Sequence, residues 1–349
     1  MTGTPVLVTG ANGYVGSWVV ERLLARGHNV HGTVRDPGDG RKVGHLLRLA
    51  GDAPGRLTLF AADLLDEAGF DAPAAGCEVV FHTASPFAVR GVRDPVRELI
   101  EPARRGTRAV LEAATRAGSV RRVVLTSSVA AIYGDAADLA TLDEDRYDER
   151  HWNRTSSERH RPYSYSKTVA ERLAWEIAAA QDRWDLVVLN PGLVLGPALS
   201  PHATSESVAL MRDFASGLYR FGAPALEVGI VDVRDVADAH MLAAETAGAS
   251  GRHILVSETR SLLEIGQILR ARFGAAYPFP RFVLPKPLVV LTSALVGIPM
   301  RFAARNVGYP LRFDSAYARA DLGVVFRPAA AAIVEHFQQL LDDGLIRRS

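Results

Sequence analysis

The sequence is poor in cysteine, in net charge and in long apolar runs. Cys77 is its only cysteine in 349 residues, which excludes an intrachain disulfide and favours a reducing compartment, so we expect a cytoplasmic protein. The formal net charge of +1 gives no electrostatic reason to expect nucleic acid or a membrane as partner. With one cysteine and no histidines at ligand spacing, we expect no metal site.

The most apolar stretch late in the chain covers residues 288–298. A membrane-spanning helix needs about 20 apolar residues, so this stretch is too short to cross a bilayer. We expect it to form a buried helix or a hydrophobic lip beside a substrate cleft. Acidic and basic residues mix between Asp143 and Arg161, which indicates an exposed loop there.

Short apolar runs alternate with helical patterns through the first 190 residues. The expected strands cover 6–9, 29–34, 57–61, 79–82, 122–126 and 186–189, with helices from residue 14 and over 96–117 and 163–181. Apolar strands that alternate with helices indicate parallel pairing with both faces buried. The predicted fold is therefore α/β, a doubly wound parallel sheet. We expect residues 1–190 to form this domain and 191–349 mainly a smaller carboxyl-terminal substrate-binding region, with the chain crossing between them.

Three glycines follow the first expected strand at intervals of three, in the run Thr9 to Gly16. Gly10 permits a tight turn, Gly13 lets the backbone approach a pyrophosphate, and Gly16 allows the helix to pack closely on the strand. The amino terminus of the helix offers N–H groups and a positive dipole to phosphates. The pattern predicts a Rossmann dinucleotide site, with loop residues Gly10, Asn12, Gly13, Tyr14, Val15 and Gly16.

The end of the second expected strand bears on the choice of cofactor. An acidic residue at this point is typical of NAD binding, whereas an arginine accommodates the 2′-phosphate of NADP. Arg35 stands there with Arg41 and Lys42 nearby, so the sequence predicts NADP(H), held by Arg35 and Lys42. Asp36 dissents, since a small shift would bring it to the ribose. Asp63, after the third strand, is expected to bind the adenine amino group or to cap a helix.

Tyr163 and Lys167 are four residues apart, so a helix places them on one face. A phenol has a pKa of about 10, and a neighbouring cation lowers it. The pair therefore predicts a proton donor that works near neutral pH. Tyr165 is only two residues from Lys167 and points elsewhere. Ser127 and Ser128 end the fifth strand, where a hydroxyl faces a bound ligand or merely satisfies backbone groups.

Together these motifs resemble the extended short-chain dehydrogenases/reductases. Within them the chain is most similar to the dihydroflavonol reductase-like group, which includes cinnamoyl-CoA reductases and microbial aldehyde and ketone reductases. The runs 81–86, 190–197 and 231–237 also fit this pattern. The resemblance implies that Tyr163 is the general acid, Lys167 its electrostatic partner and ribose ligand, and Ser128 the group that polarises the carbonyl.

The resemblance also implies further cofactor contacts at the ends of later strands. These are Leu64, Thr83, Ala84, Ser85, Thr126, Pro191, Gly192, Leu193 and Val194. Ser205 or Ser207 is placed to reach a phosphate. His82 is interpreted as a hydrogen-bonded spacer rather than an acid or base.

The implied activity is NADPH-dependent reduction of an aldehyde or ketone to the alcohol by hydride transfer, with a small-molecule carbonyl substrate. Tyr133 stands five residues after Ser128, where plant flavonoid enzymes carry asparagine, and the Asn-Trp-Tyr-Cys-Tyr motif of cinnamoyl-CoA reductases is absent. Residues 129–132 are more similar to the microbial carbonyl reductases.

Three alternatives stay open on the same fold. They are a hydroxysteroid dehydrogenase, a nucleotide-sugar epimerase or dehydratase, and a non-catalytic dinucleotide-sensing protein. Arg35 disfavours an epimerase, which recycles NAD, whereas the presence of both Tyr163 and Lys167 disfavours the sensor. We expect a monomer or a homodimer.

Overall fold

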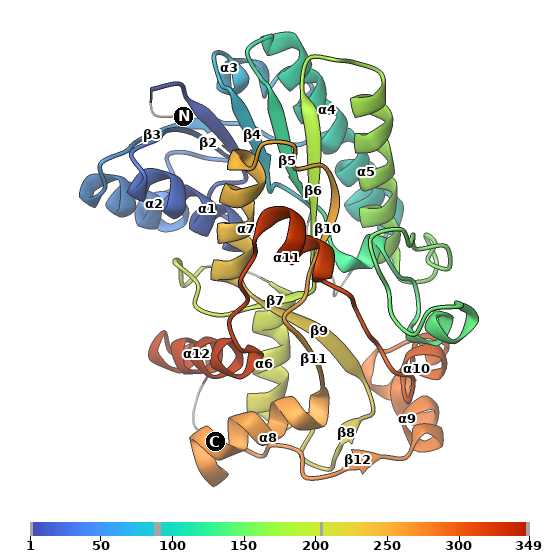
Figure 1. Cartoon of the computed structure of the whole chain (residues 1–349). Helices are drawn as coiled ribbons and strands as arrows, with labels where there is room; N and C mark the ends of the chain where they lie inside the picture. Colours follow the sequence, from blue (N-terminus) through green and yellow to red (C-terminus); the bar gives the residue numbers. More distant parts are fainter. Residues whose placement is uncertain (1–2, 87–91, 203–204, 347–349) are drawn as a thin grey trace.

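The computed structural model describes residues 3–86, 92–202 and 205–346 (Figure 1). Within them the largest sheet has seven strands, in the order β10-β6-β5-β4-β1-β2-β3, and every neighbouring pair is parallel. This confirms the predicted doubly wound fold. The strand bounds are β1 (Val6–Thr9), β2 (Asn29–Val34), β3 (Arg56–Ala61), β4 (Val79–His82), β5 (Arg122–Thr126), β6 (Asp185–Pro191) and β10 (Gly251–Leu255).

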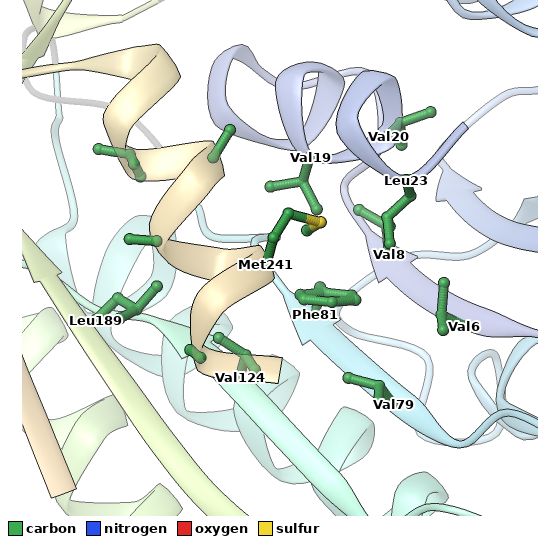
Figure 2. Packing of buried hydrophobic residues seen from close by; sticks show 14 of the residues in the cluster. Val6, Val8, Val19, Val20, Leu23, Val79, Phe81, Val124, Leu189 and Met241 are labelled. Carbon is green, nitrogen blue, oxygen red and sulfur yellow. The ribbon is translucent and has the colours of Figure 1, made fainter. Parts of the chain in front are cut away.

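Helices cover both faces of this sheet because its strands are apolar on both sides. One layer packs against Val6, Val8 and Phe81, and Figure 2 shows Val19 and Met241 from that layer on the sheet. It consists of α1 (Tyr14–Ala25), α2 (Gly40–Asp52), α7 (Val233–Glu245) and α11 (Ala316–Leu322). The opposite layer consists of α3 (Asp71–Ala74), η1 (Val96–Ile100), α4 (Glu101–Ala117) and α5 (Pro162–Ala179).

The helix predicted over 96–117 is two elements in the structure. Residues Val96–Ile100 form a π-helical turn, and the α-helix begins at Glu101. Pro102 lies directly after the π-helical turn, in the first turn of α4, and the backbone is helical through both elements. The other long helix, predicted over 163–181, runs instead from Pro162 to Ala179.

A second unit forms below the carboxyl ends of the large sheet (Figure 1). It contains the sheet β11-β9-β7 and the pair β12-β8, and helices α6, α8 and α12 share its apolar core. Its strands are β7 (Leu193–Leu195), β8 (Ala223–Pro224), β9 (Glu227–Asp232), β11 (Glu258–Ser261) and β12 (Val283–Leu284). Its helices are α6 (Glu206–Ser216), α8 (Leu262–Phe273), η4 (Gly274–Ala276), α9 (Lys286–Thr292), η5 (Ser293–Val296), α10 (Met300–Asn306) and α12 (Ala329–Asp342).

The chain returns to the large sheet after β9. Strand β10 pairs with β6 through residues Gly251 to Leu255, in parallel register. Two short turns, η2 (Val129–Ala131) and η3 (Ala136–Thr141), follow β5 and lie between the large sheet and the second unit. They carry the residues that come directly after Ser128.

Two sequence expectations need correction. For residues 288–298 the first alternative, a buried helix, is wrong, since Leu291 is 72% exposed and Leu295 is 85% exposed. The second alternative, a hydrophobic lip beside a substrate cleft, stays a prediction. The region 143–161 is not simply an exposed loop, because Tyr147, Asn153 and His160 are buried within it. These residues are held by partners far away in the sequence, which a local pattern cannot reveal.

Candidate active site

The glycine loop joins β1 to α1 at the point where the strand order reverses, between β1 and β4. Gly10 has φ +65°, a left-handed conformation that favours glycine. A Cβ on Gly16 would lie 2.3 Å from the Gly10 carbonyl oxygen and 2.8 Å from Thr83 Oγ1. The turn therefore closes only with glycine at both positions. Near Gly13 a Cβ would meet only the Gly10 carbonyl oxygen, at 3.1 Å, so its outer side is open.

The amino terminus of α1 suits an anionic group. Gly13 is the N-cap and supplies no side-chain cap, and the first turn contains no acidic residue. The first N–H groups of a helix lack partners within the helix and carry the positive end of its dipole. The Gly13 N–H is already engaged, because it donates to the Gly10 carbonyl at 2.9 Å and closes the turn. The contacts predicted between this loop, including Asn12, Tyr14 and Val15, and a pyrophosphate stay a prediction.

The side chains of α1 point away from that anion position. The Tyr14 hydroxyl donates to the carbonyl of Gly196 at 2.5 Å and lies 3.3 Å from His336 Nδ1. Burial, with the charge of Asp232, raises the pKa of Tyr14 well above its usual value. Only the backbone of Tyr14 is thus available to a phosphate, while its ring joins the glycine loop to the second unit.

The cations at the end of β2 are exposed. Arg35 follows the last residue of the strand, and within the described residues its guanidinium forms no ion pair. Lys42 lies in the first turn of α2 and pairs with Asp39 at 3.2 Å. Asp36 accepts from the Gly38 N–H at 2.8 Å, so its carboxylate is used in the turn rather than turned toward a ribose. This arrangement favours a 2′-phosphate over a free 2′-hydroxyl.

The ends of β3 and β4 contribute the next predicted residues. The Asp63 carboxylate accepts from the Leu65 N–H at 2.9 Å and thus shapes the loop, and Leu64 packs against α4. Thr83 donates to the Thr9 carbonyl at 2.6 Å, and the Ala84 N–H donates to the Thr9 hydroxyl.

His82 and Ser85 also belong to the β4 end. His82 Nδ1 lies 2.8 Å from the Thr9 hydroxyl, in agreement with its interpretation as a hydrogen-bonded spacer. Burial, with the charge of Lys167, lowers the pKa of His82 to about 3. The Ser85 hydroxyl bonds the Pro86 carbonyl at 3.3 Å. The β4 end is therefore fixed to the β1 end beside the glycine loop.

Ser128, Tyr163 and Lys167 come together at the carboxyl end of β5. The Ser128 hydroxyl lies near enough to the Tyr163 phenol to lower its pKa. Lys167 Nζ lies 5.9 Å from the centroid of the Tyr163 ring. Ser128 Oγ also accepts from the Ala130 N–H at 3.1 Å, because Ser128 caps η2. Two neighbouring hydroxyls can both donate to one incoming oxygen.

The pKa of Tyr163 departs from the sequence expectation. Burial raises it well above the usual value, the charge of Glu206 raises it further, and the bond from Ser128 lowers it only in part. The prediction that a neighbouring lysine lowers this pKa is therefore wrong for the structure as it stands, since the cost of burying a phenolate is larger. Lys167 responds instead: burial lowers its pKa to about 8, while the charge of Glu171 opposes the shift.

A buried carboxylate behind Lys167 was missed from the sequence. Glu171 is fully buried one helical turn after Lys167 and pairs with Arg252 at 2.5 Å. It also accepts from Asn190 at 2.8 Å and from the Ser127 hydroxyl. Ser127 therefore serves this carboxylate rather than the site, consistent with the choice of Ser128. Arg252 comes from β10 and is 81 residues away in sequence, so no local pattern predicts the pair.

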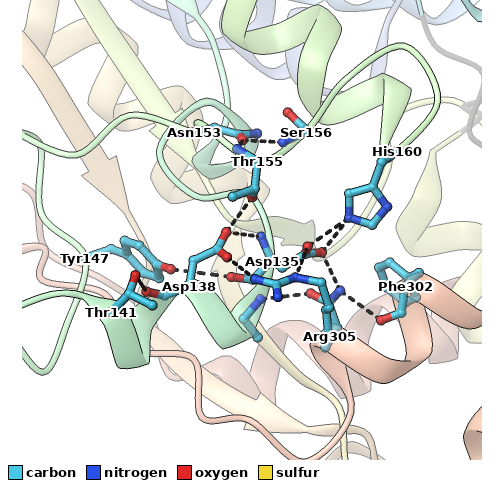
Figure 3. A network of polar contacts seen from close by, with 12 residues as sticks. Asp135, Asp138, Thr141, Tyr147, Asn153, Thr155, Ser156, His160, Phe302 and Arg305 are labelled. Atoms are coloured by element: carbon cyan, nitrogen blue, oxygen red, sulfur yellow. Dashed lines mark hydrogen bonds and ion pairs between the residues drawn. The ribbon is translucent and has the colours of Figure 1, made fainter.

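A second polar network fixes the segment that leads into α5 (Figure 3). Asp135 is fully buried and accepts from His160 at 2.8 Å, from Arg305 at 2.8 Å and from Asn306 at 2.7 Å. Burial raises the pKa of this carboxyl, but the bonds from Asn306, His160 and Arg305 outweigh it and leave the pKa lowered. Asp138 accepts from Thr155 and Arg305, both at 2.5 Å. His160 is thereby held three residues before Tyr163.

The remaining predicted residues divide between the site and its support. Thr126 Oγ1 lies 2.7 Å from His240 Nε2, so this side chain faces α7. Pro191 places its carbonyl oxygen 3.5 Å from Ser128 Oγ. A Cβ on Gly192 would lie 2.4 Å from the Gly229 carbonyl oxygen, which requires glycine where β6 passes into β7. Leu193 and Val194 lie in β7 and are half-buried.

Ser205 and Ser207 lie at the start of α6. Their hydroxyls are 2.7 Å apart, and Ser205 also caps the helix by accepting from the Val208 N–H. Both hydroxyls are thus engaged within the helix start. Their contact with a phosphate stays a prediction.

Three aromatic side chains, which we call the aromatic wall, pack together near Ser128 and Tyr163. Tyr133, Tyr147 and Phe313 pack with ring centroids 5.5–6.0 Å apart. The Arg161 guanidinium lies 5.0 Å from the Tyr133 ring centroid and 5.7 Å from that of Phe302. Arg161 has φ +53° and is the N-cap of α5, two residues before Tyr163. Within the described ranges, no group of three or more His, Cys, Asp or Glu residues is arranged to hold a metal ion.

Comparisons with known proteins give plant reductases among the relatives of this chain. Cinnamoyl-CoA reductase CAD2 of Medicago truncatula is 44% identical over 271 residues, 77% of this chain and 80% of that protein. Cinnamoyl-CoA reductase 2 of Arabidopsis thaliana is 38% identical over 344 residues, 98% and 94% of the two chains. Both plant reductases are more similar in sequence to this chain than the yeast reductase structure described next. Residues 129–132, in contrast, indicated a similarity to the microbial carbonyl reductases.

The fold comparison gives the same family. The crystal structure of the yeast methylglyoxal/isovaleraldehyde reductase Gre2, complexed with NADPH, has a TM-score of 0.79 at 26% identity, and the match covers 98% of this chain and 100% of that one. Residues 6–257 match the family described as the NAD dependent epimerase/dehydratase family. The chain therefore belongs to this family, the extended short-chain dehydrogenases/reductases that its motifs predicted.

Proposed function

We propose that the protein is an NADPH-dependent reductase that converts an aldehyde or ketone into the alcohol. The observation that carries this proposal is the grouping of the Ser128 and Tyr163 hydroxyls beside Lys167. Two hydroxyl donors aimed at one position can stabilise the negative charge that develops on a carbonyl oxygen. The glycine loop and β4 end lie at the same edge of the sheet, so a nicotinamide cofactor fits next to these donors.

Reduction of a carbonyl group needs one hydride and one proton. The cofactor, when bound, supplies a hydride to the carbonyl carbon. The π electrons of the carbonyl move to its oxygen, which accepts a hydrogen bond from Ser128 and the proton of Tyr163. The positive charge of Lys167 stabilises the resulting phenolate until the proton is replaced. Because the pKa of Tyr163 is raised, its proton is present throughout the neutral range, as a general acid for reduction requires.

NADP(H) is the proposed cofactor because Arg35 and Lys42 lie exposed where a 2′-phosphate would sit. This agrees with the NADPH bound in the Gre2 structure. We further propose that residues 191–349 form mainly the substrate-binding region. Tyr133, Tyr147 and Phe313 support this division, since their aromatic wall joins both parts of the chain next to Tyr163.

The proposal is tested by the loss of NADPH absorbance with a panel of carbonyl compounds. The panel includes methylglyoxal, isovaleraldehyde and cinnamoyl-CoA, which appear in the names of the relatives, together with aryl ketones and keto esters. Turnover of an aldehyde or ketone with NADPH, faster than with NADH, is the expected result. Tight NADPH binding without any turnover would favour a sensor, and turnover of a sugar nucleotide with bound NAD would favour an epimerase.

A further inference from the structure

One side of the second unit exposes an unusual number of aliphatic side chains. They belong to the segment from β12 to the start of α10, and we refer to them as the apolar surface. Leu291 and Leu295 are its most exposed members. Its members are Phe282, Val283, Leu288, Leu291, Leu295, Val296, Ile298 and Met300.

The segment is anchored from its inner side, which leaves the apolar surface outward. In α10, Arg305 and Asn306 bond Asp135, and Ala303 is buried beneath them. Leu288, Leu291 and Leu295 are spaced by three and four residues, so consecutive turns of α9 and η5 present them on one face. The exposure is therefore a property of a fixed element, not of a frayed end.

The segment that carries the apolar surface contains charged residues of one sign only. Residues 265–313 contain seven Lys and Arg and no Asp or Glu, whereas the rest of the chain contains 33 Lys and Arg against all 39 acidic residues. Arg281 and Arg301 flank the apolar surface, are exposed, and form no ion pair within the described residues. The near-neutral net charge of the chain is thus the sum of a basic segment, residues 265–313, and an acidic remainder.

Aliphatic side chains flanked by unpaired cations fit the surface of an anionic bilayer. Such elements lie in the interface, with apolar groups in the headgroup boundary and cations near the lipid phosphates. A second copy of the chain fits less well, because a symmetric contact would bring together two identical basic segments with unpaired cations. In the part of the chain that the structure describes, no helix has the length and apolar character to span a membrane.

We propose that the apolar surface binds reversibly to membranes that contain anionic lipids. Leu291 and Leu295 enter the headgroup boundary, and Arg281 and Arg301 contact the lipid phosphates. This inference revises the sequence expectation of no membrane partner, which rested on the near-neutral net charge and on an apolar stretch too short to cross a bilayer. It does not depend on the proposed reductase activity.

The test is cosedimentation of the full chain with vesicles. Phosphatidylcholine vesicles are compared with vesicles that also contain phosphatidylglycerol, at low and at high ionic strength. The wild-type chain should bind the anionic vesicles, bind neutral ones far less, and dissociate as salt screens the charges. Leu291→Ser/Leu295→Ser should weaken binding roughly tenfold or more, because two aliphatic side chains are lost from the boundary.

Matched variants separate this surface from general effects. Leu47→Ser/Val325→Ser removes two exposed apolar side chains elsewhere and should bind like the wild type. Arg281→Glu/Arg301→Glu should abolish the preference for anionic vesicles. Wild-type chain that does not bind anionic vesicles, or a Leu291/Leu295 variant that binds equally well, overturns the proposal. Self-association that the leucine variant abolishes, without vesicle binding, would instead assign the surface to a dimer.

Discussion

Tyr163 holds its proton more firmly than its spacing from Lys167 indicates. The sequence shows the two groups four residues apart but not how deeply both are buried, and burial raises the pKa of the phenol while it lowers that of the lysine. Residue identities at the site could thus be predicted from local motifs. Their electrostatics depend on burial and on Glu206, which the tertiary fold brings to the pair, and also on Glu171, which lies one helical turn after Lys167.

The first prediction concerns pH. The pKa of Lys167 is lowered to about 8, so its ammonium is present below that pH and is lost above it. Since the cation stabilises the phenolate, kcat/KM for carbonyl reduction should be level below about pH 8 and fall above it. Lys167→Arg keeps its charge to far higher pH, so this variant should be slower but lack the alkaline fall. A fall that persists unchanged in the variant would assign it to another group.

The second prediction compares two tyrosines of α5. Tyr163→Phe removes the proposed acid and should reduce kcat by about 10²–10⁴, with NADPH affinity nearly intact. Tyr165→Phe is the matched control and should retain most activity. Steady-state kinetics and a direct NADPH titration of both variants provide the comparison. The assignment fails if Tyr165→Phe proves the more damaging change.

The third prediction concerns cofactor choice. Arg35→Ser removes the exposed guanidinium proposed to bind the 2′-phosphate, and a hydrogen bond to a charged group contributes about 1.5–3 kcal/mol. The KM for NADPH should therefore rise about 10- to 100-fold while that for NADH changes little. Arg56→Ser, exposed at the opposite end of the neighbouring strand β3, should leave both constants unchanged. Equal losses for the two cofactors would speak against a phosphate contact.

At the scale of elements, alternation of apolar strands and helices was sufficient to predict the six expected strands and the three expected helices. It could not predict β10, because this strand follows the irregular second unit and reveals its place only by pairing with β6. The apolar pattern also left α9 and η5 undecided, because a run of apolar residues does not show whether its side chains face the core or the solvent. The spacing of apolar residues predicts that a helix or strand has an apolar face, but only the tertiary packing determines whether another element covers that face.

The fourth prediction concerns the element contacts made by Glu171. This carboxylate joins α5 to β10 through Arg252, to β6 through Asn190 and to the end of β5 through Ser127. Arg252→Leu leaves a buried charge without its partner, which should cost about 3–5 kcal/mol of unfolding free energy. Urea denaturation measures the loss. Arg312→Leu, which removes an exposed arginine paired with Asp145, should leave the midpoint nearly unchanged.

At the scale of the whole molecule, the catalytic group depends on chain segments far apart in sequence. Asp135 ties the segment before α5 to α10, and Tyr14 ties the glycine loop to Gly196. The family and the cofactor could be inferred from the sequence, whereas the substrate could not. The motifs proposed to bind the cofactor are short and contiguous, whereas Tyr133, Arg161 and Phe313, which line the proposed substrate side, are distant in sequence.

The place of β10 has a consequence for biosynthesis. The ribosome completes β6 before it makes residues 192–250, and β10 emerges only after them. At about 5–20 residues per second, that interval lasts roughly 3–12 seconds. During this time the large sheet lacks its last strand, β10. The Glu171 carboxylate also lacks the Arg252 guanidinium with which it pairs. A chaperone that shields nascent chains would be needed most in those seconds, and the native fold becomes available only once Arg252 has left the ribosome.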